Sequence, residues 1–189
     1  MLAKAGKRFF LQWETELLSR KMILHLNKSP VTCFSVVADM DKYPEFVNWI
    51  NSASCKFISD SYAKVNLTIG FPPITETYLS HVTLNYPYKI TSIARNTPVF
   101  ETLESYWEFY PDKRSLRQNG DIVPVTHCEA HYFVRFRFNS PIYQNMSKLF
   151  LDKVCTETSR AFAKRINGLT SNEEVLYNKE KHNYVLANN

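Results

Sequence analysis

The sequence predicts an α+β fold in which a curved antiparallel sheet of about six to seven strands wraps around one long C-terminal helix. Three features of the 189-residue chain predict it. Residues 62–84 alternate as the two arms of a long hairpin, other alternating segments follow one another along the chain, and residues 140–167 have the apolar spacing of a helix. The space between the sheet and the helix is expected to be an internal hydrophobic cavity.

The hairpin is the strongest of these features. Both arms, residues 62–71 and 74–84, alternate apolar and polar side chains as half-buried strands do. Gly70 permits a tight turn and the following prolines end the ladder, which predicts a rigid, apolar tip that exposes Phe71. The inward row of the second arm is unusual for a filled core because it includes three polar side chains: Glu76, Tyr78 and Ser80. A partly polar cavity explains this row.

Length and composition predict one domain with an anionic partner. The chain of 22.1 kDa carries a net charge of +5 and a pI near 9.0, which favours a membrane surface or a nucleic acid. Its four cysteines contain no Cys-x-x-Cys pair, which is typical of buried thiols in a reducing compartment. A run of about 18 apolar residues is absent from the sequence, so no bilayer-spanning segment is expected.

Residues 1–17 are interpreted as a possible mitochondrial targeting segment, because the stretch is basic and apolar up to its first acidic residue, Glu14. An ordinary basic N-terminal helix explains the same residues equally well. Residues 18–168 are expected to form the domain, and residues 169–189 a polar tail.

The first elements are a strand and two short helices. Residues 20–27 read as the strand, and Ser29-Pro30 then supplies an N-cap and a proline at the first helical position. Asp39 to Asp41 ends this helix, and Tyr43-Pro44 begins a second, shorter one. Such a helical pair suits packing across one end of a curved sheet.

Strands follow at residues 53–59, in the hairpin, and at 89–94, 100–110 and 126–138. The last two each have one apolar and one charged face, so one face of the sheet is expected to meet water. The inward row of residues 100–110 is predicted to hold five side chains: Glu101, Leu103, Ser105, Trp107 and Phe109.

Ser140-Pro141 opens the longest helix, of about 25 residues and about 37 Å, and Asn167-Gly168 ends it. Such a helix can lie along the whole sheet, which gives a helix-grip arrangement. The side chains expected on its apolar side are Met146, Leu149, Phe150, Val154, Thr158, Phe162 and Ile166.

Several runs resemble the ubiquinone-binding members of the START-like, polyketide cyclase-like superfamily. They are residues 36–49, residues 69–78 with their Gly-Phe-Pro-Pro tip, Trp107-x-Phe109, and Phe136-x-Phe138-x-Ser140. The resemblance extends from about Leu18 to Ile166 and implies the START-like helix-grip fold. It also implies a ubiquinone-binding lipid chaperone, not an enzyme, that serves respiratory electron transport and ubiquinone biosynthesis. The implied location is the matrix side of the mitochondrial inner membrane, with respiratory complexes or the quinone-biosynthesis assembly as partners.

A ubiquinone site needs donors for the quinone oxygens and a dry groove for the isoprenoid tail. The inward donors Tyr78, Ser80, Trp107, Trp49 and Tyr132 are candidates for the quinone head, beside Ser105. The tail candidates are Leu67, Ile69, Val82, Leu103, Phe136, Met146, Phe150 and Val154. Phe71, Pro72 and Pro73 are predicted to dock on an anionic membrane. Plain core packing explains each aromatic residue equally well.

Other chemistry remains open. A cyclase or dehydratase acting on an aromatic polyketide-like substrate, or a carrier of another isoprenoid or acyl lipid, could use the same cavity. Glu76 either donates to a quinone as a neutral acid or, more simply, pairs with Lys64 or Arg95. The strand spacing of His127, Glu129 and His131 could bind a metal, but a solvated face explains it better. We expect no catalytic residue, metal, catalytic cofactor or nucleic-acid partner.

Overall fold

The computed structural model describes residues 15–72, 74–95, 97–113 and 126–171. Most of the proposed targeting segment, the Asn119-Gly120 turn and nearly all of the proposed tail therefore lie outside the described residues. The elements are β1 (Leu18–Leu26), α1 (Pro30–Ala38), η1 (Met40–Lys42), α2 (Tyr43–Phe46), β2 (Ile50–Ser59), β3 (Tyr62–Phe71), β4 (Ile74–Asn85), β5 (Lys89–Arg95), β6 (Phe100–Pro111), β7 (Cys128–Phe138), η3 (Pro141–Met146) and α3 (Ser147–Asn167).

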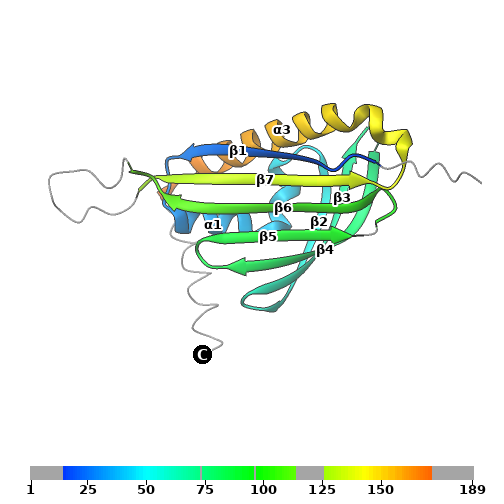
Figure 1. The fold of residues 1–189 in the computed structure, drawn as a ribbon. Helices are drawn as coiled ribbons and strands as arrows, with labels where there is room; N and C mark the ends of the chain where they lie inside the picture. The colour runs from blue at the N-terminus through cyan, green and yellow to red at the C-terminus, as the bar shows by residue number, and fades with distance from the viewer. Residues whose placement is uncertain (1–14, 73, 96, 114–125, 172–189) are drawn as a thin grey trace, which may run out of the picture.

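The predicted α+β architecture is confirmed. Seven strands form one sheet in the order β1-β7-β6-β5-β4-β3-β2, and every neighbouring pair is antiparallel. The sheet curls, so that β2 and β3 lie behind β5 and β6, while α3 runs along the side next to β1 (Figure 1). None of the described helices is long and apolar enough to cross a membrane.

The N-terminal helices form where their caps predict. The Ser29 side chain accepts a hydrogen bond from the Thr32 N–H at 3.2 Å, and Pro30 occupies the first turn of α1. The chain then leaves the helix at Asp39 and makes one 3-10 turn before Tyr43-Pro44 opens α2. These short helices contact the strands and α3, and they cover part of the inner face of the sheet.

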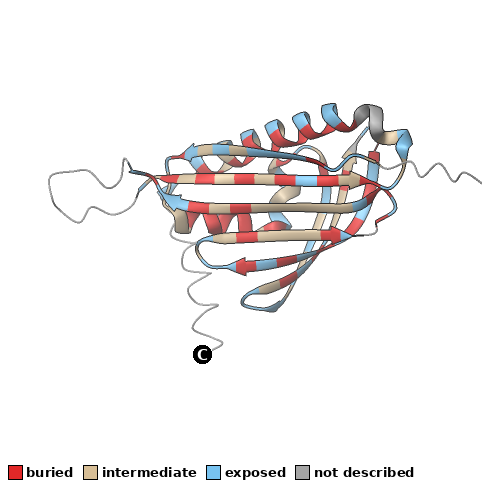
Figure 2. Cartoon of the chain, in the orientation of Figure 1, coloured by how far each residue is buried: buried red, intermediate tan, exposed pale blue. Residues whose placement is uncertain are grey.

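Burial alternates along the strands as the hairpin predicts (Figure 2). Every second side chain of β4, from Ile74 to Leu84, is buried, and the residues between are exposed. In β6 the expected row is wrong at one end. The pairing of β6 with β7 shifts register between Phe100 and Thr102, and Phe100 is buried while Glu101 is exposed. Such a shift exchanges the inward and outward positions of the strand residues that precede it.

The C-terminal helix is shorter than expected. Residues 141–146 form the 3-10 helix η3, and α3 itself has 21 residues. Leu149, which was predicted to face the core, is 66% exposed, while Leu151 is buried. Each residue turns a helix by about 100°, so Leu149 falls on the far side of the stripe formed by Phe150, Val154 and Phe162. The helix ends at Asn167, as predicted.

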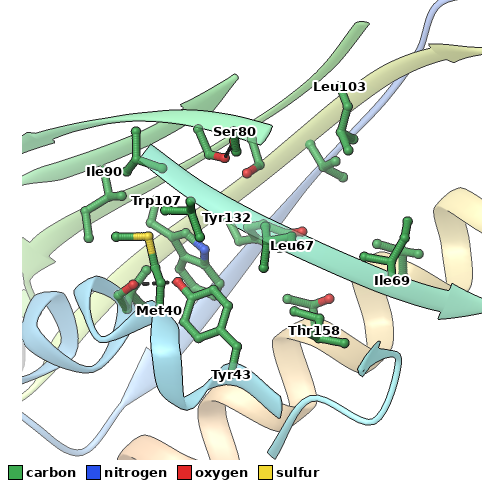
Figure 3. Close-up of a pocket in the computed structure, with 18 of the residues that line it drawn as sticks. Met40, Tyr43, Leu67, Ile69, Ser80, Ile90, Leu103, Trp107, Tyr132 and Thr158 are labelled. Atoms are coloured by element: carbon green, nitrogen blue, oxygen red, sulfur yellow. Dashed lines mark hydrogen bonds between the residues drawn. The ribbon is translucent and has the colours of Figure 1, made fainter. Parts of the chain in front are cut away.

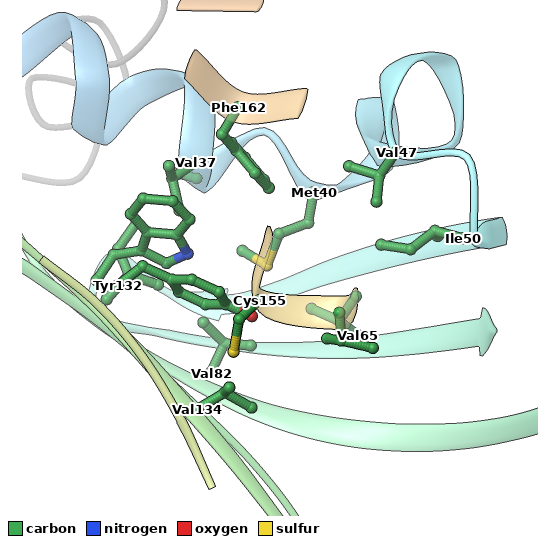
Figure 4. Packing of buried hydrophobic residues seen from close by; sticks show 14 of the residues in the cluster. Val37, Met40, Val47, Ile50, Val65, Val82, Tyr132, Val134, Cys155 and Phe162 are labelled. Carbon is green, nitrogen blue, oxygen red and sulfur yellow. The ribbon is translucent and has the colours of Figure 1, made fainter. Parts of the chain in front are cut away.

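The core joins the inner face of the sheet to the helices. Figure 4 shows Val65, Val82 and Val134 of the sheet facing Met40 and Phe162. At the other end of α3, the rings of Phe100, Phe136, Phe138 and Phe150 contact one another. All four cysteines are free thiols, and Cys33, Cys128 and Cys155 are buried. The thiols are therefore part of the packing.

Candidate ligand cavity

A cavity of about 100 Å³ lies between the inner face of the sheet and α3 (Figure 3). Strands β3 to β7 form one wall, α3 the opposite wall, and the α1–α2 segment closes one side. Its lining residues are Val37, Met40, Tyr43, Trp49, Ile50, Val65, Leu67, Ile69, Tyr78, Ser80, Val82, Ile90, Ser92, Leu103, Ser105, Trp107, Tyr132, Val134, Phe136, Phe150, Val154, Thr158 and Phe162. Most of these side chains are apolar, so the cavity suits an apolar ligand.

The structure brings most of the predicted site residues together. All five candidates for the quinone head and seven of the eight tail candidates line this cavity. The eighth, Met146, ends η3, but its side chain lies outside the described residues. At the predicted tip Phe71 ends β3 and Pro72 is exposed, whereas the Phe71 side chain and Pro73 lie outside the described residues.

Sequence reasoning did not anticipate the wall formed by the connecting segment. Met40 and Tyr43 line the cavity from η1 and α2, and Figure 3 shows both on the helical side. These residues fall where one helix ends and another begins, so no periodicity marks their orientation. Ser92 and Thr158 are also lining residues with a polar group. The sequence pattern that could have identified them is their place on the inward row of a strand and on the apolar stripe of a helix.

Three serines form a polar strip on the sheet wall. Ser80 Oγ lies 2.6 Å from Ser92 Oγ, and Ser92 is the register partner of Ser105 on β6. Ser80 is 1% exposed, whereas Ser92 and Ser105 are half-buried although they face inward. A hydroxyl pair of this kind shares one hydrogen between two oxygens, so one O–H remains for a ligand acceptor.

Three tyrosines border the same cavity as neutral groups. Burial is the main cause that raises the pKa of Tyr43, Tyr78 and Tyr132 above its ordinary value of 10.0. The Tyr43 hydroxyl donates to the Val37 carbonyl at 2.5 Å. The raised pKa keeps all three protonated at neutral pH, so they can donate hydrogen bonds but cannot serve as bases.

Two polar atoms on the wall have no hydrogen-bond partner within the described part of the chain. They are Trp49 Nε1 and Thr158 Oγ1, and both atoms are buried. The Tyr132 hydroxyl lies beside Thr158, but not in the geometry of a good bond to its oxygen. A buried donor without a partner costs about 1–3 kcal/mol, which an acceptor on a bound ligand would offset.

Glu76 is buried on the inner side of β4, but it is not a lining residue of the cavity. Burial raises the pKa of its carboxyl, and a hydrogen bond from the Val99 N–H partly lowers it again. The predicted pairs are wrong. Arg95 binds Glu104 at 2.6 Å, and Lys64 is exposed on the opposite side of the β3–β4 pair. Glu76 therefore lies beside the Val99 backbone N–H rather than beside a cation.

The histidines that the structure describes lie away from the cavity. His131 Nε2 contacts Glu129 Oε1 at 2.7 Å on the outer face of β7, and His25 Nδ1 contacts Asp112 Oδ2 at 3.2 Å. The described residues contain no group of three or more His, Cys, Asp or Glu side chains that could hold a metal. Among the described residues that line the cavity, none is a histidine or a carboxylate. The polar groups given for this wall are hydroxyls of serine, threonine and tyrosine and the indole N–H of tryptophan.

The cavity is small compared with a prenylated ligand. Pockets for drug-sized molecules measure about 300–1,000 Å³, and this one holds about 100 Å³. It suits a single ring better than a ring with a long chain. A chain attached to the ring has to leave the cavity or displace side chains.

The chain is similar to proteins named for coenzyme Q binding and to solved structures of cyclases. The profile of a family described as polyketide cyclase / dehydrase and lipid transport matches residues 26–163. The mitochondrial coenzyme Q-binding protein COQ10 homolog B of Xenopus laevis is 28% identical over 89% of this chain and 68% of its own length. The mitochondrial coenzyme Q-binding protein COQ10 of Drosophila melanogaster is 28% identical over 70% of this chain. The chain spans 52% of that fly protein.

Other similar proteins carry different names. The ribosome association toxin RatA of Rickettsia prowazekii is 29% identical over 72% of this chain and 87% of its own length. Among solved structures, the Zhui aromatase/cyclase of Streptomyces sp. R1128 has a TM-score of 0.66 at 10% identity, over 80% of this chain and 94% of that one. A START superfamily protein of Mycobacterium smegmatis has a TM-score of 0.65 at 14% identity, over 80% and 99% of the two chains. These structures share the fold, and the predicted START-like resemblance is confirmed.

Proposed function

The chain belongs to the family of polyketide cyclases, dehydrases and lipid-transport proteins, and from this premise we propose that it binds ubiquinone in the cavity between α3 and the sheet. In this proposal it is a lipid chaperone and not an enzyme. The names of the frog and fly relatives support the choice of ligand.

The observation that carries the proposal is an apolar cavity whose wall presents donors without partners. Ubiquinone has two carbonyl oxygens, and Trp49 Nε1 and the Thr158 hydroxyl can each donate to an acceptor. The ligand arrives from a bilayer, so burying its apolar parts gains little relative to lipid. Selectivity for the quinone then comes from hydrogen bonds to its head.

The alternative is a cyclase or dehydratase in the same cavity. Such chemistry needs an acid or base whose pKa lies near the working pH. The titratable side chains on the wall are Tyr43, Tyr78 and Tyr132, and burial moves the pKa of each away from neutrality. This favours binding over catalysis.

We place the protein on the matrix side of the mitochondrial inner membrane, where it would present ubiquinone to respiratory complexes and to the quinone-biosynthesis assembly. The mitochondrial relatives and the net charge of +5 support this location. A nucleic-acid role is less favoured, because arginines on the outer face of β5–β7 are already in ion pairs. Arg95 and Arg135 both bind Glu104, and Arg137 binds Glu101.

Organic extraction of the purified protein followed by mass spectrometry tests the proposal. We expect stoichiometric ubiquinone from the wild type. Trp49→Phe and Thr158→Val should each weaken quinone binding about fivefold, because each loses one hydrogen bond of about 1 kcal/mol. Without ligand, Thr158→Val should be more stable than wild type by about 1 kcal/mol, because a buried unpaired hydroxyl is gone.

Thr83→Val on the exposed side of β4 is the matched control and should leave quinone binding unchanged. An acyl lipid in place of the quinone, or no bound molecule at all, would contradict ubiquinone as the ligand. Conversion of an aromatic polyketide substrate by the purified protein would establish the alternative function.

The Gly70–Pro73 tip is proposed to dock on anionic lipid. Phe71→Asp should weaken flotation with anionic vesicles at least about tenfold and leave the fold intact, because the charge opposes burial of this side chain. Ile58→Asp is the matched control. Ile58 is 53% exposed near the opposite end of β3, so its replacement should leave flotation unchanged. Equal flotation of Phe71→Asp and wild type would remove the tip from docking.

A further inference from the structure

The sheet is incompletely paired between β4 and β5. The β4–β5 ladder covers His81–Asn85 of β4, whereas β3 pairs with Ile74–Thr83 of β4. At the other side, Ala94 and Arg95 of β5 pair with β6 but have no partner on β4. We call this opening the seam. It is bounded by residues 74–80 of β4 on one side and by β5 and residues 97–99 on the other.

A notch on the outer surface follows the seam. It holds about 590 Å³ and is lined by Thr77, Tyr78, Leu79, His81, Ile93, Arg95, Thr97 and Pro98. Leu79 is 42% exposed there, and Ile93 and Pro98 add apolar surface beside it. Tyr78 lines both this notch and the internal cavity. The cavity and the notch are therefore separated by the thickness of one strand at Tyr78.

Across the seam, the Val99 backbone N–H lies beside the Glu76 carboxyl and partly offsets the rise in its pKa that burial causes. The loop itself is fixed to the β6–β7 side. Thr97 and Phe100 exchange hydrogen bonds of 2.9 Å, and the Asn139 N–H donates to the Val99 carbonyl at 2.8 Å. Separation of β4 from this loop would therefore break the Glu76 contact and leave the β5–β6 and β6–β7 ladders intact.

We propose that the seam is the passage for the isoprenoid chain of the bound quinone and that the notch is the groove that binds this chain. The inference rests on the proposed function. Three observations carry it: the cavity has room for a ring, the seam lies beside the cavity at Tyr78, and the notch exposes Leu79 with Ile93 and Pro98 nearby. The seam also begins directly after the Gly70–Pro73 tip. A chain leaving here emerges next to the proposed membrane contact.

Two quinones that share one head separate this groove from the head site. One carries a single isoprene unit and the other a long isoprenoid chain, and both are titrated against the delipidated protein in detergent. We expect Leu79→Asp to weaken binding of the long-chain quinone about tenfold, equivalent to losing about two methylene contacts. Binding of the short quinone should not change. Thr83→Asp, four residues along the same exposed face, should change neither.

The outcomes distinguish this inference from the function on which it rests. Equal binding of the long-chain quinone by Leu79→Asp and wild type would overturn the groove, and so would equal weakening of both quinones. Failure of the wild type to bind either quinone would instead overturn the proposed function. A long-chain quinone with a photoreactive group on its isoprenoid chain, away from the head, provides a second measurement on the unaltered protein. Labelling of Leu79, Ile93 or Pro98, which line the notch but not the cavity, supports the groove, and labelling confined to other residues overturns it.

Discussion

Replacing Ser105 with phenylalanine is expected to abolish quinone binding while the protein remains folded. Ser105 faces the cavity from β6, it is half-buried, and no hydrogen bond of its hydroxyl is found within the described ranges. The larger ring would fill the space proposed for the quinone head. We expect a loss of at least about 100-fold in affinity, because forcing both rings into one space costs about 3 kcal/mol or more.

The matched control is Ser54→Phe, an exposed position on β2 that should leave binding unchanged. Isothermal titration with the short-chain quinone gives both affinities, and circular dichroism checks the fold. A Ser105→Phe protein that binds the quinone as well as wild type would show that the head lies elsewhere.

Replacing Phe162 with alanine is expected to lower the free energy of unfolding by about 3–5 kcal/mol, the usual range for a fully buried phenylalanine. Phe162 is 2% exposed. Its ring contacts those of Tyr43, Phe46 and Trp107 at centroid distances of 5.1, 5.0 and 5.0 Å. It thus joins α3 to α2 and to β6, and its loss removes one ring contact from each of the three.

Phe133→Ala is the control for this prediction. Phe133 is half-buried on the outer face of β7 and stacks on Tyr106 at 4.7 Å, so its loss should cost about 1 kcal/mol. Urea denaturation of both variants measures the difference. Equal destabilisation by the two substitutions would contradict the central place of Phe162 in the core.

The sequence was sufficient for the features that depend on local pattern. The alternation of the hairpin set the inward row of β4, and Ser29-Pro30 set the start of α1, because caps and strand parity are decided by neighbouring residues. It also predicted that the sheet would enclose a cavity, since Tyr78 and Ser80 have no reason to share an inward row in a filled core.

The features that escaped prediction depend on contacts between distant segments. The partner of Glu76 is a backbone N–H in the loop after β5, and no side-chain pattern records where such a group lies. The irregularity near Glu101 and the incomplete β4–β5 ladder are properties of strand register, which is set by the whole curved sheet. Tyr43 lines the cavity from the short segment where η1 ends and α2 begins, and the sequence of this segment shows no helical or strand periodicity.

The position of β1 has a consequence for the order of folding. Leu18 at the beginning of β1 pairs with Phe136 of β7, and the face of β1 contacts α3. Both partners lie near the other end of the described chain, so a growing or translocating polypeptide exposes β1 long before anything can cover it. Pairing across so long a loop carries a high closure entropy and is slow. β1 is therefore among the last strands of the described sheet to be secured.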